Sequence, residues 1–314
     1  MRVLVAGATG AIGVPLVDAL LAHGHSVIAI TRQPRLAEEN RHRWSDALVA
    51  DVLDRDALLA AGGSVRADAV INQLTALPGL PSRYRDLTAT NELRVRGTEN
   101  LIALAQATGA SRLVTQSFLT GYGYGDHGLG AIDERQRFGP PGRNPGLEAI
   151  IAALRSAEDQ TFHTPGLTGI ALRYGLFYGP GGPLELMVKM LRRRSFPVVR
   201  AGDGTLSYVY LPDAAAATVA ALEHGRGGEA YNIGDDEPVR WSTFITAVAE
   251  TFELPRPLRV PGWFFRALPM AYALMHSTIG LSNAKAKSEL GWTPAAPTYR
   301  EGLADARHRL GQPT

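Results

Sequence analysis

The chain contains no cysteine. This absence excludes disulfide bonds, thiolate metal ligands and cysteine nucleophiles, and with them a small secreted fold held together by disulfides. Long hydrophobic runs are missing as well. The longest apolar stretch, from Trp263 to Met275, is too short to span a bilayer, and Arg266 and Pro269 interrupt it. The first residues pass directly into a strand pattern, without a signal peptide. We therefore expect a cytoplasmic protein with no membrane partner.

A strong excess of charge of either sign is also lacking. The formal net charge is +2, the isoelectric point is about 8.9, and no basic stripe accompanies this small excess. We therefore predict that the protein has no nucleic-acid partner, and we predict no metal site. With 314 residues, 45% of them hydrophobic, the composition is that of an ordinary globular protein. The length permits one large domain or two small ones.

The most informative feature that is present is a glycine triplet near the N-terminus. Val3 to Ala6 form a short apolar run, and Gly7, Gly10 and Gly13 follow it at a spacing of three, just before an apolar helical pattern. Such a loop lets the backbone approach a pyrophosphate, and the helix behind it supplies free N–H groups. We predict that this loop binds a nucleotide, with Thr9, Ala11 and Ile12 contributing between the glycines. The alternative is an ordinary turn between a strand and a helix.

Strand and helix patterns alternate after this loop. Strands are expected at 27–30, 47–49, 69–72, 112–115 and 169–173. Helices are expected at 12–22, 54–61, 84–108, 147–161 and 213–223, and a loop rich in glycine, proline and charge at 121–146. This alternation predicts an α/β fold with a doubly wound parallel sheet, the Rossmann dinucleotide-binding architecture.

The alternation ends near Gly179, where a second and smaller region is expected. We predict a dinucleotide-binding domain made of residues 1–178 plus about 205–238. The remaining residues, 179–204 plus 239–314, are predicted to form a small C-terminal α/β region that binds the substrate.

Several further motifs in a fixed order resemble a known superfamily. They include Asp51-Val52, Asn91 with Gly97-Thr98-Glu99-Asn100-Leu101, Arg173 with Tyr178-Gly179-Pro180-Gly181, Asp213-Ala214-Ala215, Tyr231-Asn232-Ile233-Gly234, and Leu290-Gly291-Trp292-Thr293-Pro294. Together with the glycine loop, they resemble the extended short-chain dehydrogenases/reductases, in the branch of NAD(P)-dependent epimerases and dehydratases. The resemblance covers about residues 1–305. It implies an enzyme that binds a dinucleotide, and a homodimer that pairs through the helices at 84–108 and 147–161.

The tip of the second strand bears on the choice of cofactor. NAD-binding proteins usually carry an acidic residue there, whereas this chain has Thr31 and Arg32, with Arg35 nearby and no carboxylate expected beside them. Because a guanidinium pairs well with a 2′-phosphate, we favour NADP(H) over NAD. The alternative is that both arginines are solvated loop charges.

The same resemblance places other residues at the cofactor. Asp51 and Val52 are expected at the adenine, although Asp51 in an Asx turn or helix cap is the alternative. The remaining cofactor residues lie at the ends of the central strands: Leu74, Thr75, Gln116 and Tyr174.

The catalytic pair of the superfamily is missing from its expected helix. The family uses a tyrosine and a lysine four residues apart for proton transfer, but no such pair occurs at 147–161, and no lysine lies between Gly97 and Gly182. If Glu158 matches the glutamate at the end of the family's helix, Ile150 and Leu154 occupy the two catalytic positions. Neither side chain can transfer a proton.

Several residues are candidates to replace that pair. Ser117 matches the first serine of the family's Ser-Ser pattern, with Phe118 in place of the second, and it can also be a strand-end hydroxyl bonded locally. Tyr124 and Tyr122 follow in the next loop, where packing or surface roles are the alternative. Tyr178 and His127 are further candidates.

On the substrate side we place Tyr178 and Arg192. Arg192 to Arg194 end an expected helix, where they can bind a diphosphate or complement the helix dipole. The apolar segment 261–275 is expected to form a lid, a dimer surface or a core-facing helix pair.

The hypothesis we favour is an NADP(H)-dependent oxidoreductase or epimerase acting on a carbonyl or hydroxyl group of a small molecule, either a sugar nucleotide or a secondary-metabolite-like compound. Two alternatives remain open at this point. One is a dinucleotide-binding sensor or regulator without turnover, and the other is a non-redox isomerase or cyclase on the same fold.

Overall fold

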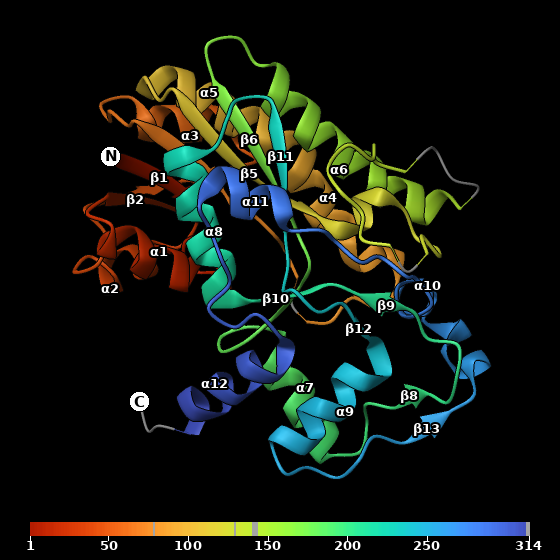
Figure 1. Cartoon of the computed structure of the whole chain (residues 1–314). Helices are drawn as coiled ribbons and strands as arrows, with labels where there is room; N and C mark the ends of the chain where they lie inside the picture. The colour runs from red at the N-terminus through yellow and green to blue at the C-terminus, as the bar shows by residue number, and fades with distance from the viewer. Residues whose placement is uncertain (78, 129, 140–143, 312–314) are drawn as a thin grey trace.

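A parallel sheet of seven strands forms the centre of the computed structural model, which describes residues 1–77, 79–128, 130–139 and 144–311 (Figure 1). The strand order is β11-β6-β5-β4-β1-β2-β3. The strands are β1 (Arg2–Ala6), β2 (Ser26–Thr31), β3 (Asp46–Val49), β4 (Ala69–Asn72), β5 (Arg112–Phe118), β6 (Thr168–Tyr174) and β11 (Glu229–Ile233). The predicted fold class, a doubly wound Rossmann-like α/β fold, is confirmed.

Burial on both faces explains why the central strands β1 and β4 are mostly continuous apolar runs rather than alternating patterns. Each residue from Val3 to Ala6 in β1 is buried, as is every residue of β4. The chain order reverses between β1 and β4, which are neighbours in the sheet. Ligands of doubly wound sheets bind at such a switch point, at the carboxyl ends of the strands.

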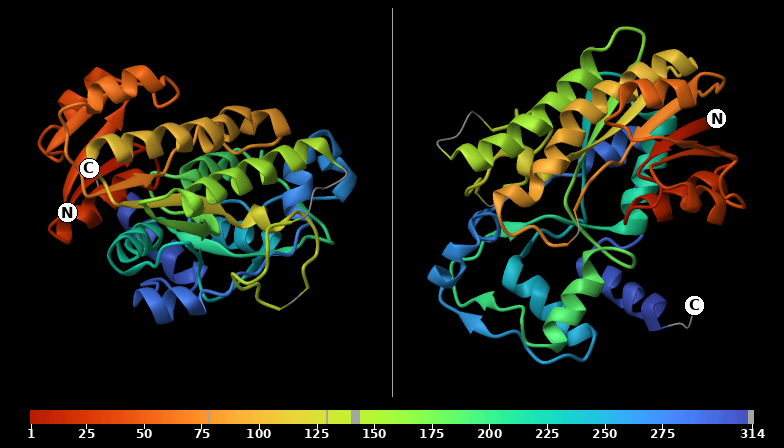
Figure 2. Two further views of the ribbon diagram at one scale, coloured as in Figure 1. Left: turned by 90° about the horizontal axis from the view of Figure 1, so that it is seen from above. Right: turned by 180° about the vertical axis from the view of Figure 1, so that it is seen from behind.

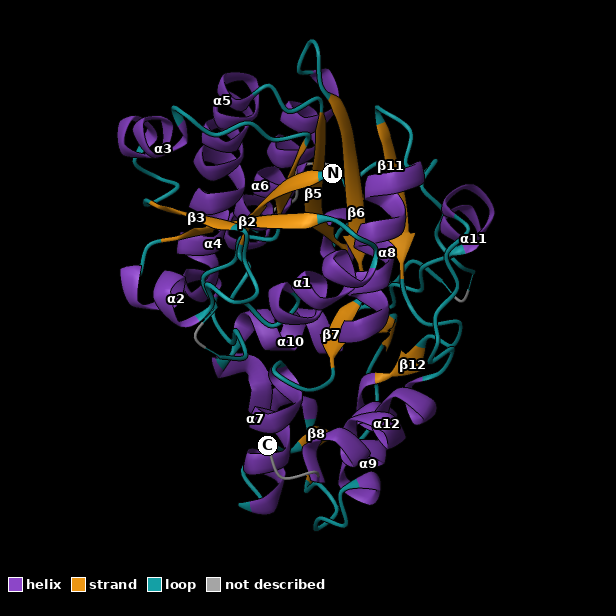
Figure 3. Cartoon of the chain, turned by 90° about the vertical axis from the view of Figure 1, so that its left-hand side faces the viewer, coloured by secondary structure: helices purple, strands orange, loops and turns teal. Residues whose placement is uncertain are grey.

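Helices cover both faces of the sheet, as Figure 2 shows in the view from above. One face carries α1 (Gly13–Ala22), α8 (Leu211–His224) and α11 (Ala284–Leu290). The other face carries α3 (Arg55–Gly62), α5 (Thr98–Thr108) and α6 (Pro145–His163). The short helix α2 (Pro34–Glu39) lies beside β2 and the edge strand β3 (Figure 3).

The helix expected at 84–108 is in fact four successive segments, so that prediction was wrong in its continuity. They are η1 (Tyr84–Leu87), α4 (Thr88–Glu92), a π-helical turn η2 (Leu93–Gly97), and α5. Hydrogen bonds flank the π turn on both sides: Ala76 N–H donates to Thr90 Oγ1 at 3.1 Å, and Asn72 Nδ2 donates to Thr98 Oγ1 at 3.0 Å. Single π turns are frequent at functional sites. An apolar periodicity does not reveal them.

A second hydrophobic cluster lies outside the sheet. It packs α7 (Pro183–Arg192), α9 (Trp241–Thr251) and α12 (Tyr299–Gly311) around buried aromatic side chains, including Tyr178, Tyr208 and Phe244. Three pairs of short strands accompany it: β7 (Leu176–Tyr178) with β10 (Tyr208–Tyr210), β9 (Thr205–Leu206) with β12 (Val239–Arg240), and β8 (Val198–Val199) with β13 (Arg259–Val260).

Parts of the C-terminal region return to the sheet. Ala286, Leu290 and Trp292 join the core around β1 and α8, although they belong to the region predicted to bind the substrate. The division into 1–178 plus about 205–238, and 179–204 plus 239–314, stays a prediction. Within the described ranges, no helix has both the length and the apolar character needed to cross a membrane.

Candidate functional site

The glycine loop after β1 has the geometry that a phosphate cradle requires. Gly7 has φ +91°, and a Cβ atom on it would lie 2.6 Å from the carbonyl oxygen of Gln73. A Cβ atom on Gly13 would collide with the carbonyl oxygen of Gly7. Helix α1 begins behind the loop with no side-chain cap and no acidic residue in its first turn. Its N-terminus can therefore receive an anion, and the residues fit a dinucleotide pyrophosphate.

Buried polar atoms without a hydrogen-bond partner gather at the carboxyl ends of β4 and β5. In the part of the chain that the structure describes, these atoms include Gln73 Oε1, Gln116 Oε1, Ser117 Oγ and Tyr124 OH. Buried polar groups in proteins are nearly always satisfied. Four such atoms near the switch point of the sheet therefore point to a ligand that supplies the missing partners.

The tip of β2 carries the residues predicted to choose the cofactor. Arg32 is highly exposed, but its guanidinium lies 3.7 Å from the Asp51 carboxylate, so the expectation of no carboxylate beside it was wrong. Strand β3 lies next to β2 and brings Asp51 there. Arg35 lies 3.4 Å from Glu39 one helical turn further on. Thr31 Oγ1 accepts a hydrogen bond from Gln33 N–H.

Asp51 also forms the Asx turn that was the alternative for it. Its Oδ1 accepts a hydrogen bond from Leu53 N–H at 2.9 Å. Val52 is buried, with its carbonyl bonded by the Asn100 amide at 2.8 Å. On the β4 side, Leu74 is partly exposed and Thr75 is exposed. A role for these residues at the adenine or the nicotinamide stays a prediction.

Two predicted site residues, Tyr174 and Tyr178, have buried side chains. Tyr174 has no exposed surface, and its hydroxyl lies 2.7 Å from Thr218 Oγ1 and accepts from Gln73 Nε2. Tyr178 is equally enclosed and donates to Asp235 Oδ2 at 2.8 Å. Their roles at the cofactor and at the substrate stay predictions.

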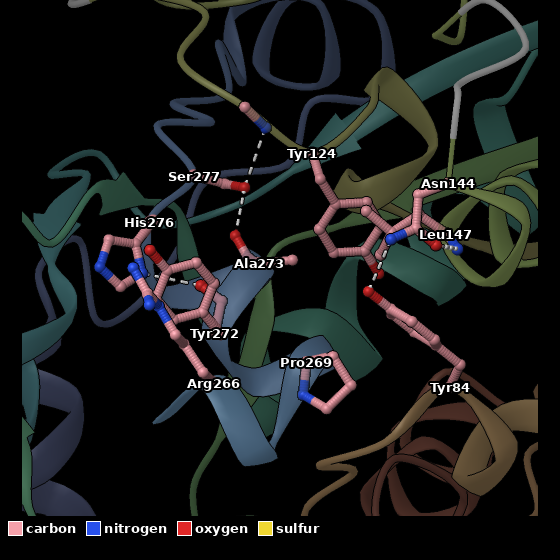
Figure 4. Close-up of a pocket in the computed structure, with 11 residues that line it drawn as sticks. Tyr84, Tyr124, Asn144, Leu147, Arg266, Pro269, Tyr272, Ala273, His276 and Ser277 are labelled. Carbon is pink, nitrogen blue, oxygen red and sulfur yellow. Dashed lines mark hydrogen bonds between the residues drawn. The ribbon is translucent and has the colours of Figure 1, made fainter. Parts of the chain in front are cut away.

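A cavity of about 350 Å³ opens beside the end of β5. Its lining residues are Tyr84, Tyr124, Gly125, Asn144, Leu147, Arg266, Pro269, Tyr272, Ala273, His276 and Ser277. Figure 4 shows Tyr84 and Tyr124 on one side, facing Tyr272 and His276 across the cavity. The volume suits a small organic molecule.

Helix α10 (Pro269–Met275) forms one wall of this cavity and is tied to the rest of the site. Met270 N–H donates to the carbonyl of Ser82 at 3.1 Å. Beyond the helix, Gly125 N–H donates to Ser277 Oγ at 3.0 Å, and Thr278 N–H donates to the carbonyl of Gly125 at 2.8 Å. Of the roles considered for segment 261–275, the structure favours a wall over the cavity.

Of the candidate proton donors, Tyr124 is the one that lines the cavity. Burial raises its pKa to about 12, against the opposing effects of the nearby Thr120 hydroxyl and the charge of Arg94. Tyr122 is almost fully buried, where its hydroxyl donates to Asn232 Oδ1 and accepts from Arg173. His127 Nε2 lies 3.1 Å from the carbonyl of Gly123, within its own loop. The geometry favours Tyr124.

Comparison with protein families identifies the family of this chain. Residues 3–234 match the model described as the NAD-dependent epimerase/dehydratase family. The chain belongs to that family. It is therefore an NAD(P)-dependent oxidoreductase or epimerase, as the glycine loop and the motif order predicted.

Relatives of this family member include several reductases. A 3-diazoavenalumate denitrifying reductase from a Streptomyces species is 36% identical over 96% of the chain and 99% of that protein. A 4-hydroxy-2-methyl-3-oxo-4-farnesyl-3,4-dihydroquinoline-1-oxide ketoreductase from Stigmatella aurantiaca is 26% identical over 99% of the chain and 97% of that protein. The crystal structure of UDP-glucose 4-epimerase from Thermotoga maritima shares the fold, with a TM-score of 0.81 at 22% identity over 99% and 98% of the two chains.

Glu158, which the sequence suggests as the match to the glutamate at the end of the family's catalytic helix, is paired with Arg173. The correspondence of Ile150 and Leu154 to the catalytic pair stays a prediction. Glu158 and Arg173 form a buried bidentate ion pair, at 2.6 and 2.9 Å, between α6 and β6. One and two turns before Glu158, Leu154 and Ile150 are both buried, in a cluster with Leu87 and Met270. These side chains attach α10 to α6 rather than transfer protons.

Arg192, the predicted substrate residue, lies at a different hollow. This hollow has a volume of about 640 Å³ and lies at the C-terminal end of α7. Its lining residues are Glu185, Val188, Lys189, Arg192, Arg193, Phe252, Arg307, Leu310 and Gly311. None of them lines the cavity beside Tyr124. Both readings of Arg192 remain predictions.

Sequence reasoning missed four polar residues at or near the site: Tyr84, Arg94, Asn144 and His276. Tyr84 begins the helix expected at 84–108 and Asn144 lies in the loop expected at 121–146, and neither pattern predicts that Asn144 Nδ2 donates to Tyr84 OH at 2.9 Å. His276 follows the apolar segment and stacks on Tyr272. Arg94 lies on the π turn. A long basic side chain within the family motif around Gly97 was the sequence feature that could have marked it as a site residue.

Proposed function

We propose that the chain is an NADPH-dependent reductase that acts on a small, activated aromatic compound, with a diazo compound as the favoured substrate. The observation that carries this proposal is the apolar pair Ile150 and Leu154, buried under Met270 where the family places its proton-transfer residues.

Loss of the pair fits a reaction in which no substrate oxygen has to be protonated. Reduction of a carbonyl produces an alkoxide, which requires a positioned acid. In the reaction named for the 36% identical relative, a diazo group is removed. A bound dinucleotide would supply the hydride that replaces the diazonium group on its carbon, and dinitrogen would leave with the electrons of the C–N bond.

The chain's own residues then bind and orient. The loop of Gly7, Gly10 and Gly13 and the N-terminus of α1 hold the pyrophosphate. Arg32, assisted by Arg35, pairs with the 2′-phosphate. The ion pairs that these arginines form with Asp51 and Glu39 lie at the surface and are weak, so the phosphate can replace the two carboxylates. The cavity beside Tyr124 holds the substrate, with α10 as one of its walls.

A second candidate, reduction of a carbonyl, is favoured by the position of Tyr124. Its buried hydroxyl has no hydrogen-bond partner among the described residues, and its pKa is raised to about 12, so it is protonated at neutral pH. In this role Tyr124 donates a proton to the carbonyl oxygen, and Ser117 holds that oxygen.

One experiment tests both candidates. The protein is incubated with NADPH or NADH and either 3-diazo-4-hydroxybenzoate or 4-hydroxyacetophenone, and loss of absorbance at the nicotinamide band is followed together with released dinitrogen. Heat-inactivated protein corrects for direct reduction of the diazo compound. Dinitrogen equal to the NADPH consumed supports the main proposal. Consumption with the ketone alone supports the second candidate, and binding of NADPH without any consumption indicates a sensor.

A further inference from the structure

Arg94 lies on the π turn η2, between α4 and α5. Four residues before it, Thr90 accepts a hydrogen bond from Ala76. Three residues after it, Gly97 packs against Leu74, which lies 3.6 Å from the place where a Cβ atom would stand. The helix face that carries Arg94 is therefore turned toward the residues that follow β4, at the carboxyl edge of the sheet.

The guanidinium of Arg94 has no carboxylate partner in the described ranges. Its one hydrogen bond to a side chain runs to Asn91 Oδ1 at 3.2 Å, although a guanidinium has five N–H groups. Burial lowers the pKa of Arg94 to about 10, and among the described residues the Tyr124 phenol opposes this effect while no carboxylate does. Two residues further on, Arg96 is exposed and pairs with Glu92 at 2.6 Å, as an ordinary surface arginine does.

The groups around Arg94 are donors as well. The guanidinium of Arg94 is close enough to Tyr124 to lower the pKa of its hydroxyl, and that hydroxyl has no hydrogen-bond partner in the described part of the chain. Tyr84 also interacts with Tyr124, and because its oxygen accepts from Asn144, its own O–H remains able to donate. Arg94 is only partly exposed. A half-buried cation beside two hydroxyl groups, with no carboxylate partner in the described ranges, is complementary to a bound anion.

We propose that Arg94 and Tyr124 bind a carboxylate of the substrate at the carboxyl edge between β4 and β5. This inference rests on the proposed function and narrows its substrate to small aromatic acids. A carboxylate suits the site because a planar guanidinium forms two parallel hydrogen bonds with its two oxygens. When the carboxylate is bound there, one end of the substrate is fixed. The number of atoms between the carboxylate and the reacting carbon then determines where that carbon lies in the site.

The test measures binding and needs no turnover. Calorimetric titration, in the presence of NADP+, compares 4-hydroxycinnamate with its methyl ester, which has the same ring but no negative charge. The variants are Arg94→Gln and the matched control Arg96→Gln from the same helical turn, with Arg94→Lys as the conservative variant. Titration of NADP+ alone checks that each variant is folded.

The wild-type protein is expected to bind the acid at least ten-fold more tightly than the ester. Arg94→Gln should weaken acid binding ten- to hundred-fold and leave the ester unchanged, Arg94→Lys should recover part of the loss, and Arg96→Gln should change neither. Equal binding of acid and ester by the wild-type protein, or no binding of the acid, would overturn the inference. So would a loss of NADP+ affinity in Arg94→Gln as large as the loss of acid affinity, because Arg94 would then serve the dinucleotide. If the protein binds the acid but releases no dinitrogen from the diazo compound, the proposed function is wrong and the carboxylate site is still supported.

Discussion

Arg32 shows how much of the cofactor site a single residue type can predict. Its side chain is 71% exposed at the tip of β2 and lies next to Asp51. The sequence did not predict this neighbour, because the pairing of β2 with β3 that brings Asp51 there is a tertiary feature. An exposed ion pair of this kind contributes about 0–1 kcal/mol, whereas a guanidinium–phosphate contact is charge-assisted and stronger. The arginine is therefore free to exchange Asp51 for a 2′-phosphate.

We expect Arg32→Ala to weaken NADPH binding about ten-fold or more and to leave NADH binding nearly unchanged, because only NADPH carries the 2′-phosphate. Fluorescence titration with both dinucleotides measures this. Arg41→Ala, which removes an arginine paired with Glu38 on the same segment, serves as the control and should alter neither affinity. Equal losses for NADPH and NADH would show that Arg32 does not select the phosphate.

Tyr124 separates the two candidate reactions. Tyr124→Phe removes one hydroxyl from the cavity wall and keeps the ring. If the substrate is a carbonyl compound, kcat should fall 10²- to 10⁴-fold, the usual contribution of a positioned acid. If it is a diazo acid, kcat should change little and KM should rise, because the hydroxyl then only binds. Steady-state kinetics with both probes decides. Unchanged kcat and KM with every active substrate would remove Tyr124 from the site.

At the scale of the elements, burial explains both the successes and the failures of prediction. Strand β4 has the predicted limits of 69–72, because a strand buried on both faces is a continuous apolar run. Asp54 caps α3 as expected, accepting from Ala57 N–H at 3.1 Å. The π turn at Leu93–Gly97 was missed, since the bonds that flank it come from β4, a distant part of the sequence.

Helix α10 depends on a small apolar contact that can be tested by itself. Met270 is buried against Ile150, Leu154 and Leu87, the cluster that replaces the catalytic pair. Met270→Ala should lower the free energy of unfolding by about 2–5 kcal/mol and raise KM, because it leaves a void under the cavity wall. Denaturant unfolding and steady-state kinetics measure the two effects. The exposed Leu258→Ala is the control, with a change of about 0.5 kcal/mol or less. A neutral Met270→Ala would show that α10 does not need this contact.

At the scale of the whole molecule, the sequence pattern was sufficient for the architecture but not for the packing between distant segments. The alternation of strands and helices predicted the doubly wound sheet, because each element must bury an apolar face. Tyr178 was expected at the substrate since it follows β6 in the family's motif. Its position against Asp235 depends on how the second cluster folds back, and no local pattern records that.

Asp235 makes the stability of the molecule depend on pH. Burial raises its pKa from 3.8 to about 8, and nearby Asp213 adds to the effect. Between about pH 4 and pH 8 the folded protein therefore keeps a proton that the unfolded chain releases, so the contribution of Asp235 falls as the pH rises through this window. We expect Asp235→Asn to flatten the decline of the unfolding free energy between pH 5 and pH 8. Denaturant midpoints at several pH values measure it, and parallel curves for both proteins would contradict the shift.

The central claim is that this fold transfers a hydride although it lacks the tyrosine–lysine pair. The most direct measurement is a single turnover of 3-diazo-4-hydroxybenzoate with NADPH carrying deuterium at both positions of C4, followed by mass spectrometry and NMR of the product. The account predicts one deuterium on the carbon that held the diazo group, with one dinitrogen released for each NADPH oxidised. A product without deuterium, or no oxidation of NADPH, would contradict it.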